Sequence, residues 1–328
     1  MKFFRVFISI LLCVLIAFTI TFGVNKISEK KDLTENLGYK GIITVWHVDT
    51  FEGGSGSRKA FLLKIARNFE KVNNGVLVFV ISHTPLSVQE NFIKGFYPDI
   101  ISYGAGVEVE NVISLPIENY ASGGIIAEKN LAIPWCRGGY FLIKNNEFNN
   151  KNINKKVCLV SDTEYNLPVL SILDKNYNFN LRVNTQYNAY SGFVNGEGEY
   201  LLGTQRDIVR LNNRGFNYSA TPLSEFNDLY QYVSVTSTNN EKIEKSIDFI
   251  NYLLSKESQQ KLNEIDMFSC FYNVEYADEK MSQMQQINNF KTISVFNKRE
   301  NLTYLKELSH LAYGGDISAN NKIKNFII

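Results

Sequence analysis

The order of predicted elements near the amino end constrains the fold more than any other feature of the sequence. Residues 42–48 form a short run rich in β-branched side chains, and apolar residues then recur at helical spacing over 61–69. Residues 76–81 are six consecutive apolar residues, a pattern typical of a strand covered on both faces. A helical stretch over 86–96 leads to another strand at 100–103. Strand, helix, strand, helix, strand in this order predicts a parallel sheet with helical crossovers, and therefore an α/β fold.

A second group of short apolar strands follows in the middle of the chain, and 328 residues exceed what one hydrophobic core usually organises. We therefore expect two α/β lobes. The expected strands of the second group are 131–133, 140–143, 157–160 and a stretch near 200–202. The expected division is 41–136 with 235–265 for lobe 1, 137–234 for lobe 2, and 266–328 for a C-terminal helical segment that packs on the lobes.

The amino-terminal residues predict export. Lys2 and Arg5 precede an uncharged apolar run over 6–24, which is nearly as long as one bilayer core requires. Positive residues before such a run keep the amino end in the cytoplasm, so the remaining chain should lie on the extracytoplasmic face of the membrane. We expect residues 1–25 to be a signal peptide or a retained membrane anchor, with retention favoured by the length of the run, and 26–40 to be a polar spacer.

Charge and cysteine content exclude several classes of protein. Lys and Arg number 34 against 33 Asp and Glu, so the net charge of +1 provides no field for nucleic acid. Cys13 lies inside the apolar run, and the other cysteines, Cys136, Cys158 and Cys270, cannot all pair within one chain; whether two of them form a disulfide stays open. The histidines are scattered, with no metal-ligand spacing. We expect no metal and no cofactor.

Four glycine-containing loops follow predicted strands, where open α/β sheets bind their ligands. They span 46–57, 103–106, 135–140 and 203–207. Each has a purely structural alternative: the glycines can serve tight turns, Trp46 can belong to the core, and Arg206 can pair with a neighbouring carboxylate such as Asp207. No catalytic motif accompanies these loops. Gly54-Ser55-Gly56 falls short of a nucleophile elbow, and nothing local pairs Cys136 with a histidine, so we do not expect an enzyme.

Several segments together resemble the bacterial extracellular solute-binding proteins that serve sugar importers, of the maltose-binding-protein type. They are Ile42-Ile43-Thr44-Val45-Trp46-His47, Tyr97-Pro98-Asp99-Ile100, Leu131-Ala132-Ile133-Pro134-Trp135, and Tyr232-Val233-Ser234-Val235 with the helical segment 249–255. The chain departs from the family in two ways, because it has no convincing lipidated cysteine and its middle lobe, 145–229, is short.

The resemblance implies a two-lobed, type II periplasmic-binding-protein-like fold with a hinge near 134–139 and 232–236. It also implies a small polar ligand, a carbohydrate in the first place, held between the lobes and passed to the permease subunits of an ABC importer. Carried over position by position, the ligand-binding residues are Trp46, Gly54, Ser55, Gly104, Arg137, Gly203 and Arg206. Two other functions stay open on the same scaffold: an extracytoplasmic glycan hydrolase or lyase, and a sensory module that binds a partner protein.

Overall fold

The computed structural model describes residues 39–117, 122–148 and 156–328. Residues 41–328 form one compact unit, which contains every helix and strand discussed below. In the described ranges no helix has both the length and the apolar character needed to cross a membrane. The apolar run at 6–24, on which the expectation of a signal peptide or anchor depends, lies outside the described residues.

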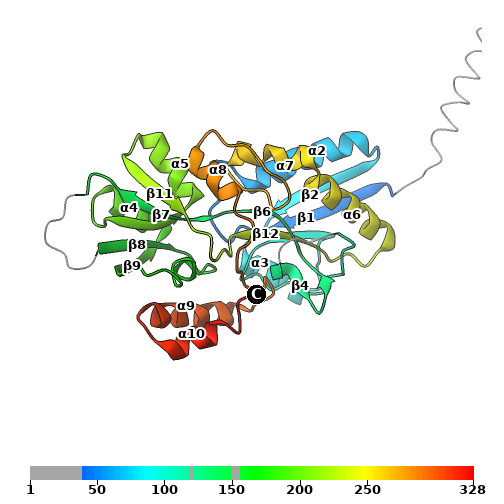
Figure 1. Ribbon diagram of the computed structural model, residues 1–328. Helices are drawn as coiled ribbons and strands as arrows, with labels where there is room; N and C mark the ends of the chain where they lie inside the picture. Colours follow the sequence, from blue (N-terminus) through cyan, green and yellow to red (C-terminus); the bar gives the residue numbers. More distant parts are fainter. Residues whose placement is uncertain (1–38, 118–121, 149–155) are drawn as a thin grey trace, which may run out of the picture. The chain divides into compact units, whose positions relative to one another are not determined.

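The first sheet confirms the parallel arrangement that the element order predicts. Strands β1, β2 and β3 are parallel (Figure 1). Strand β12 is antiparallel to both β3 and β6, so β6 runs in the same direction as the first three strands. The spatial order is β2-β1-β3-β12-β6. The strands span Gly41–His47 (β1), Val76–Ser82 (β2), Ile100–Tyr103 (β3), Ile133–Arg137 (β6) and Tyr230–Val235 (β12).

Helices cover the two faces of this sheet unequally. The helices α2 (Arg58–Val72) and α7 (Lys256–Gln259) lie above the sheet in Figure 1, α6 (Asn240–Leu254) lies at its right-hand end, and α3 (Pro85–Ile93) lies below it. Helix α2 begins where Ser57 accepts a hydrogen bond from the backbone of Ala60, and its apolar residues face the sheet.

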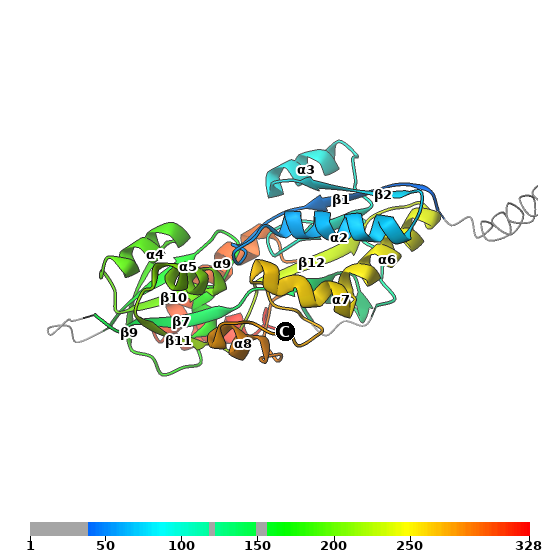
Figure 2. The ribbon, with the colours of Figure 1, turned by 90° about the horizontal axis from the view of Figure 1, so that it is seen from above.

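Strand β2 differs from the sequence-based expectation. Val76, Val78 and Val80 are buried under α2, but Leu77, Phe79 and Ile81 on the other face are exposed. The prediction of a strand covered on both faces is therefore wrong. The second face is exposed because β2 lies at the edge of the sheet and α3 covers only part of that face (Figure 2). A run of six apolar residues therefore does not establish that both faces of a strand are buried.

The second sheet has the spatial order β11-β7-β10-β8-β9, with β8 parallel to both β9 and β10 and β7 antiparallel to its neighbours. Phe141, Leu159, Phe193 and Leu201 are among the residues of its core. The elements are β7 (Tyr140–Asn145), β8 (Lys156–Asp162), β9 (Phe179–Thr185), β10 (Tyr200–Thr204), β11 (Tyr218–Pro222), α4 (Gln186–Val194) and α5 (Gln205–Arg214).

Among the described strands, the chain passes from the first sheet to the second once and returns once, and the carboxyl-terminal part then contacts both lobes. The first crossing is the turn between β6 and β7, at Gly138 and Gly139, and the second lies between β11 and β12. Because β6 and β12 both pair within the first sheet, the segment at 131–133 contributes to that sheet and not to the second. The return crossing also comes a few residues before position 235, where the sequence analysis divides the lobes.

The carboxyl-terminal part of the chain contains the helices α8 (Glu279–Gln285), α9 (Arg299–Tyr313) and α10 (Ile317–Ile323), separated by irregular segments. Met281 and Met284 are buried, as their spacing suggests, and they join the core of the second sheet. The backbone of Val295 donates to Gly123, so this part also contacts the side of the first sheet. The remaining elements are η1 (Ser122–Gly124), β4 (Ile125–Ile126), β5 (Lys129–Asn130), η2 (Pro168–Ser171) and η3 (Gln260–Ile265).

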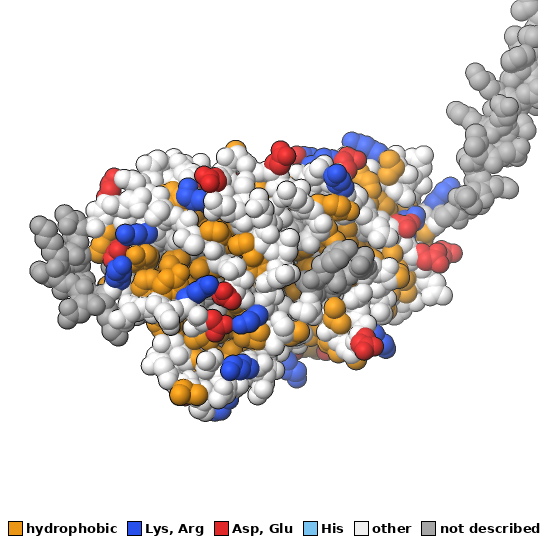
Figure 3. All heavy atoms as spheres, viewed as in Figure 1, with side chains coloured by type: hydrophobic (Ala, Val, Ile, Leu, Met, Phe, Trp, Pro, Cys, Tyr) orange, Lys and Arg blue, Asp and Glu red, His pale blue; other side chains and the backbone are white. Residues whose placement is uncertain are grey.

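Charged side chains of both signs are scattered over the face seen in Figure 3. No extended area of one sign appears on this face, in keeping with 34 basic and 33 acidic residues in the sequence.

Candidate functional site

The loop that follows β1 folds around a buried arginine. Arg58, at the start of α2, is 2% exposed, and its Nε donates to Asp49 Oδ1 at 2.7 Å. The guanidinium also donates to the carbonyl of Phe51 and lies 4.0 Å from the centre of the Phe51 ring. Arg58 therefore holds the first half of the loop in place through charge-assisted hydrogen bonds and a cation–π contact.

A chain of hydrogen bonds extends from Asp49 into the first sheet. His47 Nε2 lies 3.1 Å from Asp49 Oδ1, and His47 Nδ1 lies 3.1 Å from Ser102 Oγ. Ser102 Oγ also accepts from Trp135 Nε1 at 3.0 Å and from Gln231 Nε2 at 3.1 Å. With both acceptor positions used, the Ser102 hydroxyl must donate to Nδ1, so the imidazole is neutral and its Nε2–H donates to Asp49.

The protonation states of these groups follow from their surroundings. Burial lowers the pKa of His47 and keeps its imidazole neutral. Burial alone would raise the pKa of Asp49, but the hydrogen bond from His47 and the charge of Arg58 outweigh it, so the pKa is lowered and the carboxylate is charged.

Ser102, His47 and Asp49 share residue types with a hydrolase triad, but their arrangement does not present a nucleophile. Ser102 is fully buried, and its oxygen is saturated by the two donors of Trp135 and Gln231. A triad serine needs a free lone pair facing substrate. This chain of hydrogen bonds instead ties together β1, β3, β6 and β12.

The second half of the loop contacts the amino-terminal end of α5, a helix of the lobe that contains the second sheet. Arg210 donates to both carboxylate oxygens of Glu52, at 2.9 and 3.1 Å, and Arg206 donates to the carbonyl of Gly54. We term Glu52, Gly54, Arg206 and Arg210 the interlobe bridge. The loop after β1 and the start of α5 therefore meet through charged groups that can bind hydroxyl or carboxylate oxygens.

Local structure explains why the two arginines are presented in this way. Thr204 caps α5, with its hydroxyl accepting from Arg206 N and its backbone donating to Asp207 Oδ2 at 2.9 Å. Burial raises the pKa of Asp207 to about 6. Gly203 leaves the space that Asp207 needs, because a Cβ on Gly203 would lie 2.4 Å from Asp207 Oδ2. The spacing of four residues places Arg206 and Arg210 on one face of the helix.

A second contact between the lobes is made by an aromatic ring. Tyr165, in the loop after β8, packs against Gly106, where an added Cβ would lie 2.2 Å from the ring. Gly106 has φ of +85°, in the region that favours glycine. Gly104 is equally restricted, since its Cβ would lie 2.1 Å from Thr50 Oγ1. The glycines after β3 thus let other segments approach the backbone closely.

Of the residues expected to bind ligand, the structure brings Gly54, Ser55 and Arg206 together at the interlobe bridge. Gly54 packs so closely on η3 that a Cβ would lie 2.3 Å from the carbonyl of Ile265, and Ser55 beside it is exposed. Gly104 packs against Thr50 of the same loop, and Gly203 packs against Asp207 in the first turn of α5.

Trp46 lies elsewhere. It is 8% exposed and stacks on Phe92 of α3 with ring centres 5.9 Å apart, while His83 approaches to 4.4 Å. This burial favours the alternative that assigned Trp46 to the core.

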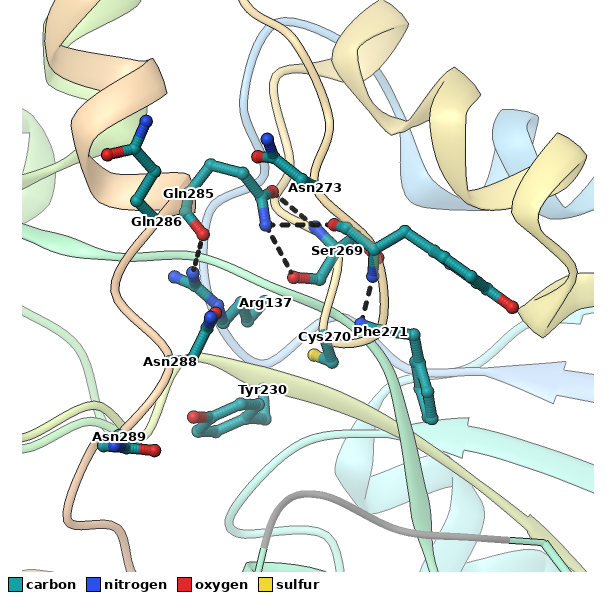
Figure 4. A pocket seen from close by; sticks show the side chains of 11 residues that line it. Arg137, Tyr230, Ser269, Cys270, Phe271, Asn273, Gln285, Gln286, Asn288 and Asn289 are labelled. Atoms are coloured by element: carbon teal, nitrogen blue, oxygen red, sulfur yellow. Dashed lines mark hydrogen bonds between the residues drawn. The ribbon is translucent and has the colours of Figure 1, made fainter.

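Arg137 points toward the end of α8 (Figure 4). One of its terminal nitrogens donates to the carbonyls of Met284 at 3.0 Å and Ile287 at 2.9 Å. The side chain is buried and lines a cavity of about 450 Å³ beside β6 and β12, which lie at the expected hinge and which we term the hinge strands.

Neither a metal site nor a disulfide is found in the ranges that the structure describes. No three His, Cys, Asp or Glu side chains there could hold a metal ion together. Cys136, Cys158 and Cys270 are free thiols, and burial raises the pKa of Cys158 and of Cys270 to about 12.

No protein-family model and no curated protein matches this sequence. Solved structures do match its fold. The sugar-binding protein MalE from the phytopathogen Xanthomonas citri superposes with a TM-score of 0.62 at 11% identity, over 87% of this chain and 95% of that chain. The cyclic alpha-maltosyl-1,6-maltose binding protein from Arthrobacter globiformis gives a TM-score of 0.58 at 10% identity, over 87% of this chain and 97% of that chain.

This chain has the fold of these sugar-binding proteins. The two-lobed, type II periplasmic-binding-protein-like architecture that the sequence resemblance implies is thereby confirmed. A protein described as "Two-component system protein mediate signal transduction" matches with a TM-score of 0.51 at 12% identity, over 81% of this chain and 100% of that chain.

In this maltose-binding-protein-like fold, three polar residues lie between the lobes that are not among the ligand-binding residues expected from the sequence. Glu52 stands inside the first candidate loop, Arg210 lies one helical turn beyond Arg206, and Tyr165 follows the strand at 157–160. Strand ends and helical spacing are the signals that could have pointed to them.

Proposed function

We propose that this protein is an extracytoplasmic solute-binding receptor. It captures a small polar ligand, a carbohydrate in the first place, between its two lobes and delivers it to an ABC importer. The observation that carries the proposal is the interlobe bridge, where Arg206 and Arg210 from one lobe meet Glu52 and Gly54 from the other. The fold shared with MalE and with the maltosyl-maltose binding protein supports a sugar as the first ligand to test.

The chemistry of the bridge suits a hydroxylated ligand. The guanidinium groups of Arg206 and Arg210 offer planar sets of donors, and the Glu52 carboxylate offers acceptors. A sugar that enters between the lobes can exchange these mutual contacts for hydrogen bonds to its own hydroxyls. Ser55 is exposed next to Gly54 and can add one more hydroxyl group, while Gly104 and Gly106 allow close approach to the backbone after β3.

Positions outside the bridge keep a supporting role in this proposal. Gly203 preserves the cap of α5, and Trp46 and Arg137 fix the ends of β1 and β6 without facing the ligand. The hinge would lie in 134–139 and 232–236, close to the two crossings between the sheets. We expect the apolar run at 6–24 to direct export, as a cleaved signal or a retained anchor.

The experiment is a ligand screen on the full-length chain in detergent, with sugars, polyols, amino acids and oxyanions. A ligand at about a hundred times its dissociation constant should stabilise the fold by about 2.7 kcal/mol. Each hit is then titrated by calorimetry, and the mixture is analysed for products. Saturable binding with the ligand recovered intact supports the receptor, whereas turnover supports a hydrolase or lyase.

The variant Arg206→Ala should weaken binding of that ligand about tenfold or more, because charge-assisted hydrogen bonds contribute roughly 1.5–3 kcal/mol. Arg182→Ala is the matched control, since Arg182 is exposed on β9 and away from the bridge. Equal affinities of the two variants would place the ligand elsewhere.

A second function is favoured by one specific observation, the likeness to the two-component system protein. In that case the protein would bind its ligand in the same way and pass the signal to a membrane partner. Ligand uptake by cells that express the chain distinguishes the two, because only an importer's receptor changes the rate of uptake.

A further inference from the structure

The cavity beside the hinge strands, which we term the hinge cavity, is separate from the interlobe bridge. It measures about 450 Å³, within the range of small-molecule sites. Its walls come from the paired ends of β6 and β12, from residues 269–273 and from residues 285–289. None of the four residues of the interlobe bridge is among its lining residues.

The hinge cavity carries a positive charge that no acidic side chain neutralises in the described parts of the chain. Arg137 is the one charged side chain among the lining residues described, and it is 2% exposed. Its contacts are the carbonyls at the end of α8 and the rings of Phe268 and Phe290, at 5.1 and 5.0 Å. These contacts stabilise a buried guanidinium but leave the net charge in place, so the cavity favours an anion.

A second donor stands next to this charge. Tyr230 pairs with Arg137 across the two strands and is 6% exposed. Its hydroxyl has no hydrogen bond to any residue that the structure describes. Burial raises the pKa of Tyr230, against the opposing effect of the Arg137 charge, so the phenol stays protonated and can donate. A guanidinium beside a phenol is a combination that suits a carboxylate.

The rest of the wall indicates the kind of molecule that would carry the carboxylate. Asn273, Asn288 and Asn289 bring side-chain amides, which both donate to and accept from hydroxyl groups. Phe271 and the Tyr230 ring add apolar surface for a carbon skeleton. In the view of Figure 4, Tyr230 lies below Arg137 and Cys270, with Asn288 and Asn289 beside it.

We propose that the hinge cavity binds a small hydroxylated carboxylate, with Arg137 and Tyr230 holding the carboxylate group and the asparagine amides holding its hydroxyls. This site differs from the one between the lobes in both its residues and its ligand charge. It therefore stands or falls independently of the proposed receptor function.

The test is calorimetric titration of the full-length chain with glucuronate, gluconate and lactate at low ionic strength, and with glucose as the neutral match to glucuronate. We expect at least one of the three carboxylates to bind at a hinge-cavity site that glucose does not occupy. Tyr230→Phe should weaken that binding about three- to tenfold while the unfolding midpoint stays close to that of the wild type. No binding by any of the three carboxylates would overturn the proposal.

A negative charge introduced at the exposed edge of the hinge cavity tests carboxylate binding without disturbing the fold. Asn288 is exposed at the edge of the cavity, so Asn288→Asp sets a second carboxylate against the bound one and should weaken binding at least tenfold. Asn176→Asp makes the same change in net charge at an exposed loop position away from the cavity and should leave binding unchanged.

Arg206→Ala separates this site from the interlobe bridge. If carboxylate binding falls in Arg206→Ala but not in Tyr230→Phe or Asn288→Asp, the carboxylate lies between the lobes. That outcome would contradict the hinge-cavity site and leave the receptor proposal intact. Equal weakening by Asn288→Asp and Asn176→Asp would likewise count against a specific site.

Discussion

At the scale of single residues, burial separates side chains that the sequence alone leaves equivalent. Trp46, near the end of one predicted strand, and Arg206, just after another, both suit a ligand, but Trp46 packs into the core while Arg206 reaches the opposite lobe. The sequence pattern cannot make this distinction, because the last residue of a strand can point to either face of the sheet. Arg137 illustrates the same limit, since it leaves the end of β6 toward α8.

Trp46→Ala should therefore act on folding. We expect it to lower the free energy of unfolding by about 3–5 kcal/mol, because it removes a buried ring that stacks on Phe92. Denaturant unfolding measures this loss, and Trp46→Phe, which keeps an aromatic ring, should lose less. An unchanged midpoint combined with weaker ligand binding would show that the indole faces the ligand after all.

His47 should make stability depend on pH in a definite direction. The pKa of His47 is lowered in the folded protein from an ordinary value of 6.5. Below about pH 6.5 the imidazole is therefore protonated in the unfolded chain while it is still neutral in the folded protein. Stability must then fall as the pH drops below about 6.5, by up to about 1.4 kcal/mol for each pH unit. The buried carboxyls Asp207 and Asp228, whose pKa values are raised to about 6, act in the opposite sense.

Comparison with a variant isolates the histidine. Unfolding in urea at pH 7.5 and pH 5.5 should show a larger loss of stability in the wild type than in His47→Gln, since the carboxyls are common to both proteins. The same pH dependence in the two proteins would mean that His47 is not held neutral.

At the scale of elements, the sequence predicts well which helices and strands form and in what order. It predicts poorly which faces of a strand are covered by other elements. The first three strands and α2 follow from apolar runs and helical spacing. The exposed side of β2 could not be predicted, because the position of a strand at a sheet edge depends on pairing between distant segments. The interlobe bridge is missed in part for the same reason, since Glu52 and Arg210 meet only through the fold.

Adjacent substitutions in β2 test its one-sided burial. Val78→Ala removes buried methyl groups under α2 and should cost about 2 kcal/mol of unfolding free energy. Phe79→Thr changes a side chain that is 56% exposed and should stay within about 0.5 kcal/mol of the wild type. Urea unfolding of the two variants gives the comparison, and a comparable loss in both would mean that the second face is covered as well.

At the scale of the whole molecule, the two lobes are joined by the strand crossings, by the carboxyl-terminal part that contacts both of them, and by the polar contacts of the interlobe bridge. Partly exposed ion pairs of this kind contribute little net stability and can be exchanged for other polar partners. A hinge between two well-packed lobes, held by exchangeable contacts, is an arrangement in which a bound solute can change the balance between open and closed forms. The ligand itself cannot be predicted from the fold, because the same scaffold serves different solutes.

Small-angle scattering of the full-length chain, with and without a ligand identified in the screen, measures whether the two lobes close on the ligand. Because a ligand favours the state that it binds more tightly, the radius of gyration should be smaller with saturating ligand than without it. Arg206→Ala, which weakens the ligand's hold on one lobe, should need a higher ligand concentration to reach the same decrease. Identical scattering profiles at demonstrated saturation would contradict a receptor that closes on its solute.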